Sequence, residues 1–163
     1  MTSSVTAYIG LGSNLGNPLQ QVSRARQALA TLAGCRGAVH SSLYRSDPVG
    51  PPGQPDYINA VTRLETRLAP EALLDRLQAI EQAHHRVRNA HWGPRTLDLD
   101  LLLYDDSVID HPRLQVPHPH LAERGFVLYP LAELNPQLTL PDGTPLQRLL
   151  DRCPMGSLQR VGV

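Results

Sequence analysis

The chain has 163 residues, of which 41% are hydrophobic, and its 15 basic side chains balance its 15 acidic ones. A chain of this length can bury roughly 68–70% of its unfolded surface in one core, so we expect a single domain over residues 1–163. Zero net charge excludes a global field that would draw the protein to nucleic acid or to an anionic membrane. We therefore expect small-molecule partners, no nucleic-acid or membrane partner, and a monomer.

All 15 basic side chains are arginine. The lack of lysine excludes a Walker-type lysine and a Schiff base, and leaves phosphate recognition to guanidinium groups, although genome-wide base composition explains the same replacement. The only cysteines, Cys35 and Cys153, lie far apart, and the first residues show no basic start followed by an apolar run. No segment approaches the roughly 20 apolar residues of a membrane span. We expect a reduced, cytoplasmic setting.

A strand and a helix open the predicted order. Residues 5–12 form an apolar run that ends in turn-forming residues, as a buried strand does. Asn17 can cap a helix whose first position is Pro18, and apolar residues at helical spacing continue it until Gly34.

A second strand, a loop and a third strand follow. Residues 38–46 alternate as one strand. Four prolines and two glycines in residues 47–56 cannot continue a sheet and predict a long loop. Residues 57–68 resume as a strand in which Tyr57 and Asn59 share one face.

A helix from Pro70 to near His85 precedes the last core strand, which begins after Thr96 and continues to Tyr104. This strand alternates leucine with aspartate, so Asp98 and Asp100 share one face with their backbones about 7 Å apart. Two such carboxylates suit magnesium, which leaves its other positions to water and phosphate oxygens. The pattern alone is equally compatible with two acids on the wet face of an ordinary strand.

The remaining elements are a short strand at residues 108–109 and helices at 126–134 and 145–151. The order strand, helix, strand, strand, helix, strand predicts a ferredoxin-like βαββαβ core, in the α/β (α+β) class. We expect an antiparallel-rich sheet flanked by helices, with the additional helices at the C-terminus.

Three glycines at the end of the first strand, Gly10, Gly12 and Gly16, resemble a dinucleotide-binding fingerprint. The match is poor, because the last glycine comes one residue late and no acid follows about 20 residues on.

Six of the seven histidines lie between His84 and His120. The pair His118 and His120 could chelate zinc, but no cysteine lies near and the flanking prolines hinder ring orientation. A solvated pair, or a single phosphate-binding histidine, is the alternative.

Four arginines fall in segments that flank loops or the acid pair: Arg86, Arg88, Arg95 and Arg124. If they converge they would hold a polyphosphate, whereas scattered surface arginines need no common site. The only tryptophan and the only phenylalanine, Trp92 and Phe126, lie in the same segments, and Tyr57 follows the proline-rich loop. Flat rings near a polar pocket suggest stacking on a heteroaromatic ligand, with ordinary packing as the alternative.

Six segments of the chain carry recognisable sequence motifs: residues 7–16, 44–50, 54–60, 86–88, 92–100 and 116–126. Together they resemble one family, the 6-hydroxymethyl-7,8-dihydropterin pyrophosphokinases of folate biosynthesis. The string Trp-Gly-Pro-Arg-Thr-Leu-Asp-Leu-Asp at 92–100 is long and specific, and the resemblance extends over most of the chain.

The resemblance implies transfer of the β,γ-pyrophosphoryl unit of ATP, the co-substrate, to the hydroxymethyl oxygen of the pterin, with release of AMP. It also implies two magnesium ions held by Asp98 and Asp100, which clamp the entering and departing oxygens. The roles it implies are catalytic for Arg86, Arg95, Asp98 and Asp100, ATP-binding for Gln78, Glu81, Arg88, Trp92, His118 and Arg124, and pterin-binding for Ser46, Val49, Tyr57, Asn59 and Phe126.

The loops at 47–56 and 86–92 would then be lids that exclude water. Two positions depart from the family pattern: His91 stands where many relatives have arginine, and Ser46-Asp47 stands where a threonine and a proline are common. Neither change touches the acid pair.

Two rival functions use the same features. The βαββαβ order also builds RNA-recognition domains, but these carry an aromatic and basic string on a central strand that this chain lacks. A metal-dependent hydrolase would use the acid pair and the histidines, with water replacing the pterin. AMP formed only with pterin would indicate the kinase, AMP without pterin a hydrolase, and no turnover a binding module.

Overall fold

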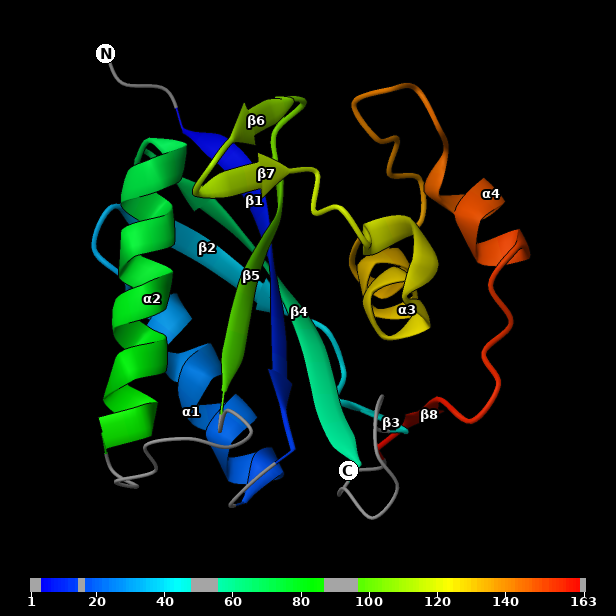
Figure 1. Cartoon of the computed structure of the whole chain (residues 1–163), viewed down its shortest axis with the longest axis horizontal. Helices are drawn as coiled ribbons and strands as arrows, with labels where there is room; N and C mark the ends of the chain where they lie inside the picture. The colour runs from blue at the N-terminus through cyan, green and yellow to red at the C-terminus, as the bar shows by residue number, and fades with distance from the viewer. Residues whose placement is uncertain (1–3, 15–16, 48–55, 87–96, 162–163) are drawn as a thin grey trace.

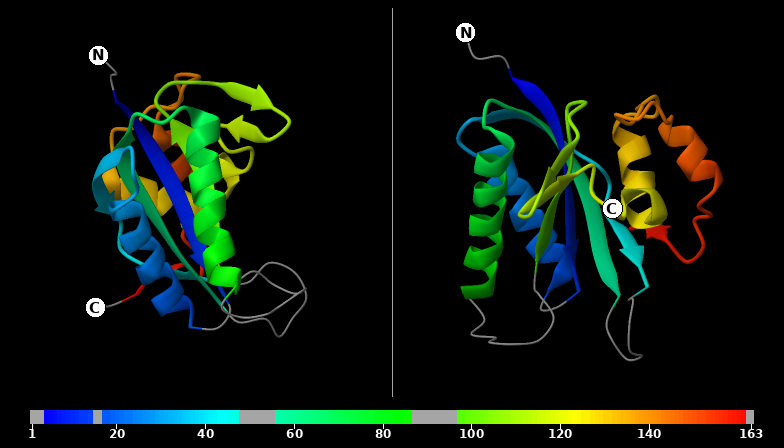
Figure 2. Two further views of the ribbon diagram at one scale, coloured as in Figure 1. Left: turned by 90° about the vertical axis from the view of Figure 1, so that its left-hand side faces the viewer. Right: turned by 45° about the horizontal axis from the view of Figure 1, so that its top comes forward.

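One antiparallel sheet separates two layers of helix (Figure 1). The computed structural model describes residues 4–14, 17–47, 56–86 and 97–161, with only the backbone of His85 and Arg86. Helices α1 (Pro18–Ala30) and α2 (Pro70–Arg86) cover one face of the sheet, and α3 (Gly125–Leu134) and α4 (Leu146–Asp151) lie on the other (Figure 2). Within these described ranges, no helix has the length and apolar character that a membrane span requires.

The strands of the sheet are β1 (Val5–Ser13), β2 (Cys35–His40), β3 (Tyr44–Ser46), β4 (Tyr57–Thr66), β5 (Asp98–Tyr104) and β8 (Gln159–Arg160). Their order is β5-β1-β4-β3-β8, and β2 also pairs with β4. Every pairing is antiparallel. Because β1 and β4 lie side by side in the centre, with β5 beyond β1, the predicted ferredoxin-like βαββαβ core is confirmed.

Helix α1 begins as predicted and ends earlier. The Asn17 side chain accepts a hydrogen bond from the backbone N–H of Gln20 at 3.3 Å, which caps the helix. The helix ends at Ala30, before Gly34, which has a φ of +84° in the turn into β2. A Cβ at Gly34 would lie 2.9 Å from the Leu68 side chain, so both backbone conformation and space require glycine there.

The single strand predicted for residues 38–46 is wrong, because one extra residue divides it. His40 pairs with Thr62, while Tyr44 pairs with Asn59. The chain therefore advances four residues from His40 to Tyr44 while β4 advances only three between their partners. This is a β-bulge, which ends the ladder of β2 before β3 begins. Buried Ser41 fills the gap: its N–H donates to the carbonyl oxygen of residue 61, and its Oγ accepts from the N–H of that residue.

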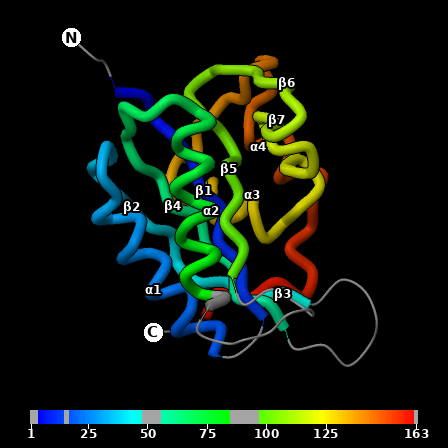
Figure 3. Tube along the Cα trace, turned by 60° about the vertical axis from the view of Figure 1, so that its left-hand side comes forward, coloured from blue at the N-terminus to red at the C-terminus, as the bar shows by residue number. Residues whose placement is uncertain are grey.

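Two apolar clusters hold the layers together. Ile9, Leu64 and Leu77 belong to the cluster between the sheet and the layer of α1 and α2. In Figure 3, α2 of this layer lies in front of β1 and β4. Val61 and Leu128 belong to the cluster between the opposite face and α3–α4. The apolar side chains of the central strands therefore pack on both faces, which is the condition for a sheet between two helical layers.

The C-terminal third contains the two predicted helices, now bounded as α3 and α4, and three elements that were not predicted. The short strand expected at 108–109 is β6 (Ile109–His111), and it forms a hairpin with the unpredicted β7 (Leu114–Val116). The 3-10 helix η1 (Leu121–Glu123) precedes α3, and β8 returns to pair with β3. The segment from η1 to the start of α3 faces the sheet at the end of the cavity described next.

Candidate active site

A cavity of about 480 Å³ lies between the sheet and the segment that leads into α3. One wall comes from β1, β3, β4 and β5, and the other from η1 and the first turn of α3. The volume falls in the range of pockets that enclose small molecules.

Two glycines form the floor of this cavity. On β1, Gly12 pairs with Asp98 on one side and with Asn59 on the other, and Gly10 pairs with Asp100. A Cβ at Gly12 would lie 3.1 Å from the Asn59 amide nitrogen, which is closer than ordinary packing allows. The missing side chains leave an open trough across the sheet, from the acids to the amide.

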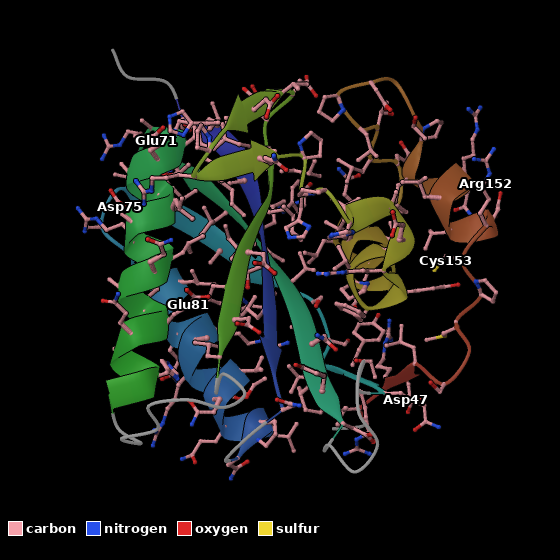
Figure 4. All side chains as sticks on the ribbon, viewed as in Figure 1. Asp47, Glu71, Asp75, Glu81, Arg152 and Cys153 are labelled. Atoms are coloured by element: carbon pink, nitrogen blue, oxygen red, sulfur yellow. The ribbon has the colours of Figure 1, made fainter. Side chains whose placement is uncertain are left out.

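Asp98 and Asp100 form the acidic end of the trough. Both are half-buried and line the cavity, while the alternating Leu97 and Leu99 point away from it and are 0% and 4% exposed. The predicted division of this strand into an acidic and an apolar face is confirmed. From α2, a carboxylate oxygen of Glu81 (labelled in Figure 4) accepts a hydrogen bond of 2.8 Å from the N–H of Leu99, the residue between the two acids.

The donor set at this end fits magnesium better than zinc. Within the described ranges, no group of three or more histidine, cysteine, aspartate or glutamate side chains could hold a metal ion. A protein-only zinc site needs such a set, whereas magnesium is held by one or two carboxylates together with water and phosphate oxygens. Asp98 and Asp100, on the open trough, are such a pair.

The opposite end of the trough combines aromatic rings with an oriented amide. The hydroxyl of Ser46 donates to Oδ1 of Asn59 at 2.7 Å, which holds the amide nitrogen beside the glycine floor. Tyr57 and Phe126 also line the cavity, and the Arg124 guanidinium lies 5.6 Å from the centre of the Phe126 ring. Polar groups fixed between flat rings suit a planar heteroaromatic ligand.

Burial raises the pKa of the Tyr57 phenol above its usual value, and the negative charge of Asp98 adds to the rise. The phenol is therefore protonated at neutral pH and can donate a hydrogen bond. Asp98 thus acts electrostatically on the far end of the trough as well as on its own end.

A second cavity, of about 310 Å³, has one wall residue, Asp100, in common with the first. Its walls include His118, on the segment after β7, and Arg113, between β6 and β7. An Arg113 guanidinium nitrogen lies 2.6 Å from Oδ1 of Asp75 and 3.3 Å from Oε1 of Gln78, so α2 holds the arginine at the rim.

Burial lowers the pKa of His118, and the positive charges of Arg124 and His120 lower it further, against the opposing charge of Asp100. The imidazole is therefore neutral at physiological pH and offers one donor and one acceptor nitrogen. The backbone N–H of His118 donates to the carbonyl oxygen of Leu102 at 3.0 Å, which ties this segment to β5.

The structure brings together many of the residues for which a role was predicted. The ones that line the two cavities are Ser46, Tyr57, Asn59, Asp98, Asp100, His118, Arg124 and Phe126. Gln78 and Glu81 lie outside both linings and contact Arg113 and the β5 backbone, respectively. Val49, Arg88, Trp92, Arg95 and the side chain of Arg86 lie outside the described residues.

Several lining residues were not predicted for these cavities: Gly10, Gly12, Arg113 and Glu123, while His120 was considered only as a zinc ligand or a solvated residue. The glycines had a usable signal, because a spacing of two residues in a strand puts both on one face. The remaining residues belong to short connecting segments in which no periodicity marks an inward face. Of these, His120 and Glu123 face each other across η1, with Nδ1 and Oε2 3.7 Å apart.

Residues 8–136 match the profile of the 7,8-dihydro-6-hydroxymethylpterin-pyrophosphokinase (HPPK) family. The chain is 52% identical to the 2-amino-4-hydroxy-6-hydroxymethyldihydropteridine pyrophosphokinase of Pseudomonas aeruginosa over 94% of this chain and 95% of the relative. It is 47% identical to the Haemophilus influenzae protein of the same name, over 90% and 91%.

Among solved structures, the HPPK-DHPS chain of Plasmodium falciparum has a similar fold, with a TM-score of 0.75 at 13% identity. The alignment covers 93% of this chain, which spans only 46% of that longer one. This likeness concerns the fold alone.

Proposed function

The chain belongs to the 7,8-dihydro-6-hydroxymethylpterin-pyrophosphokinase family, and on that premise we propose that its two cavities hold the two substrates of one transfer reaction. The activity is pyrophosphoryl transfer from ATP to 6-hydroxymethyl-7,8-dihydropterin, in folate biosynthesis. The hydroxymethyl oxygen bonds to the β-phosphorus, the bond from that phosphorus to the α-phosphate oxygen breaks, AMP departs with this oxygen, and the hydroxyl proton is released.

The observation that carries the proposal is the position of Asp100, which lines both cavities. The attacking oxygen and the phosphorus must meet within about 3–3.5 Å, so the two ligands must approach at a shared wall. A pterin in the larger cavity and ATP in the smaller one would meet beside the acid pair.

The larger cavity suits the pterin. Its ring system would stack between Tyr57 and Phe126, while Asn59 and Ser46 would read its polar edge. Because the Asn59 carbonyl oxygen already accepts from Ser46, the amide presents its N–H groups to the ligand, and a pterin ring nitrogen or carbonyl can accept from them.

The smaller cavity suits the nucleotide. Neutral His118 and the cationic Arg113 on its walls would contact ATP, with Gln78 and Glu81 supporting the site from α2. Arg124 would reach the phosphates from the wall of the larger cavity. The resemblance adds Arg86, Arg88, Arg95 and Trp92 from the segment that approaches β5 along the chain. Guanidinium groups bind phosphate oxygens by paired hydrogen bonds, so they would neutralise charge without a lysine.

Asp98 and Asp100 would hold two magnesium ions against the phosphates. When bound, magnesium would neutralise phosphate charge and lower the pKa of the attacking hydroxyl. The chain itself contributes the spacing of the two carboxylates, which the β5 backbone and the Glu81 hydrogen bond to Leu99 hold in place.

We further propose one domain over residues 1–163, a monomeric state and a cytoplasmic location. The six-stranded sheet supports one domain, since the two apolar clusters of the described residues pack on its opposite faces. The two rival functions, a hydrolase and a binding module, are left to experiment.

The test is release of AMP from ATP and magnesium, with and without 6-hydroxymethyl-7,8-dihydropterin. We expect AMP only when the pterin is present, in a one-to-one ratio with the pterin diphosphate. AMP without pterin would favour the hydrolase, and no AMP in either case would favour a binding module.

A further inference from the structure

The last described residues of the chain return to the cavity wall. β8 pairs with the outer edge of β3, Tyr44 opposite Arg160, and the Val161 N–H donates to the Leu43 carbonyl oxygen at 2.8 Å. Leu158 is 8% exposed and anchors the segment. β8 has two residues and β3 has three, and strands this short are not stable without neighbours.

Two side chains of this segment reach the residues around β3. The hydroxyl of Ser157 donates to Oδ2 of Asp47 at 2.5 Å. Asp47, which Figure 4 shows beside β8, lines the larger cavity directly after β3. A guanidinium nitrogen of Arg160 lies 3.4 Å from the Tyr44 hydroxyl and 3.4 Å from Oε1 of Glu133. The segment therefore holds β3 at its start through Tyr44 and just beyond its end through Asp47.

β3 in turn positions the polar end of the cavity. Its last residue, Ser46, orients the Asn59 amide by the 2.7 Å hydrogen bond. A shift of β3 would move Ser46 and Asp47 together, while two strands, β4 and β1, separate β3 from the acid pair on β5. Loss of the contact between the C-terminal segment and β3 should therefore disturb the end of the cavity at Ser46 and Asn59 and leave the acid pair in place.

We propose that Ser157–Val161 is a positioning segment that holds the Ser46, Asp47 and Asn59 wall in the geometry the pterin requires. This inference rests on the proposed function, since it assigns that wall to the pterin. Ser157 acts through Asp47, and Arg160 acts through Tyr44.

The experiment compares Ser157→Ala and Arg160→Gln with matched controls on helix surfaces, Ser23→Ala on α1 and Arg148→Gln on α4, in steady-state assays that vary each substrate. We expect the KM for the pterin to rise roughly five-fold in Ser157→Ala, as loss of a hydrogen bond to a charged group implies. The KM for ATP and the kcat should stay within about two-fold of the unaltered chain, because the acid pair is not displaced. Ser157→Thr should restore the pterin KM.

A lower thermal midpoint with a fall in apparent kcat and no selective rise in the pterin KM would show a general loss of structure, and that result would overturn the proposal. So would a pterin KM equal to that of the controls in both variants. Failure of the proposed function is distinguishable, because the unaltered chain would then release no AMP in response to pterin.

Discussion

Two groups of polar side chains on the same side of the sheet are organised in opposite ways. At the end of α3, the Glu133 carboxylate accepts hydrogen bonds from the N–H and hydroxyl of Ser42 at 2.8–3.1 Å and from the Tyr44 hydroxyl at 2.8 Å, and pairs with Arg160. At the start of α3, Asp98 and Asp100 face a cavity of about 480 Å³.

The difference separates a carboxylate that joins elements of the fold from two carboxylates for which we propose a function. Glu133 is surrounded by protein donors that join β3, β8 and the bulge to α3, so its charge is compensated within the fold. The acid pair faces a trough that glycines keep open, so a bound cation or ligand can use its charge. If the distinction is correct, mutations at one end should lower turnover and mutations at the other should lower stability.

The largest effect is expected at the acid pair. Asp98→Ala or Asp100→Ala should lower kcat by about 10³-fold, because each removes a carboxylate from the place where phosphate charge must be neutralised. The thermal midpoint should stay close to that of the unaltered chain, since neither side chain packs in an apolar cluster. Activity assays and thermal unfolding on the same samples measure both.

The matched control for this pair is Asp110→Ala, an exposed aspartate on β6. It should leave kcat unchanged. Near-normal turnover in both acid-pair variants would contradict the proposed role of the acid pair, because those carboxylates would then contribute no more to turnover than Asp110 does.

The next effect is expected at the floor of the trough. Gly12→Ala would place a methyl group 3.1 Å from the Asn59 amide nitrogen, and overpacking of this kind costs about 1–3 kcal/mol, so the pterin KM should rise roughly ten-fold. Gly10→Ala should have a smaller effect, because its methyl group would meet the flexible end of Leu102 at 3.3 Å. Equal pterin KM values in all three proteins would show that the trough is not occupied by the pterin.

At the other end of α3, Glu133→Gln should lower the free energy of unfolding by about 1–2 kcal/mol, as loss of charge-assisted hydrogen bonds at a side chain still 26% exposed implies. The kcat at saturating substrates should change by less than about two-fold. Glu65→Gln, which removes a surface ion pair of 3.8 Å with Arg36, is the control and should cost at most about 0.5 kcal/mol. Denaturant unfolding of the unaltered chain and both variants measures the free energies, and steady-state assays measure the kcat.

The smallest effect is a pH dependence of that stability. Burial alone would raise the pKa of Glu133, but hydrogen bonds from Tyr44 and Ser42 and the charge of Arg160 outweigh it and lower the pKa below the ordinary 4.5. The unfolded state then takes up the proton first, so the stabilisation is present above pH 4.5 and is lost as the pH falls through the lower, folded-state pKa. The stability gap between the unaltered chain and Glu133→Gln should therefore narrow below pH 4.5, and a constant gap would contradict the assignment.

The long elements could be predicted because their patterns are local. Asn17 marks the start of α1, and the alternation around Asp98 and Asp100 identifies both faces of β5. The bulge at Ser41 and the pairing of β8 with β3 depend on contacts with residues distant in the chain, which no local periodicity records.

The site was predictable to a similar extent. The sequence pattern and the family resemblance named Tyr57, Phe126, Asp98, Asp100 and His118, and all five line the two cavities. The role of Gly10 and Gly12 was not, because it follows from their register against Asp98, Asp100 and Asn59. A glycine spacing in a strand indicates a floor only when the residues on the neighbouring strands are known.

The most direct test of the shared-wall account is a crystal structure of the chain with a non-hydrolysable ATP analogue, the pterin substrate and manganese in place of magnesium. We expect two anomalous-scattering peaks at Asp98 and Asp100, the pterin between Tyr57 and Phe126, and the nucleotide beside His118, with the hydroxymethyl oxygen facing the β-phosphorus. Metal bound away from the acid pair, or both ligands on the same side of Asp100, would contradict the account.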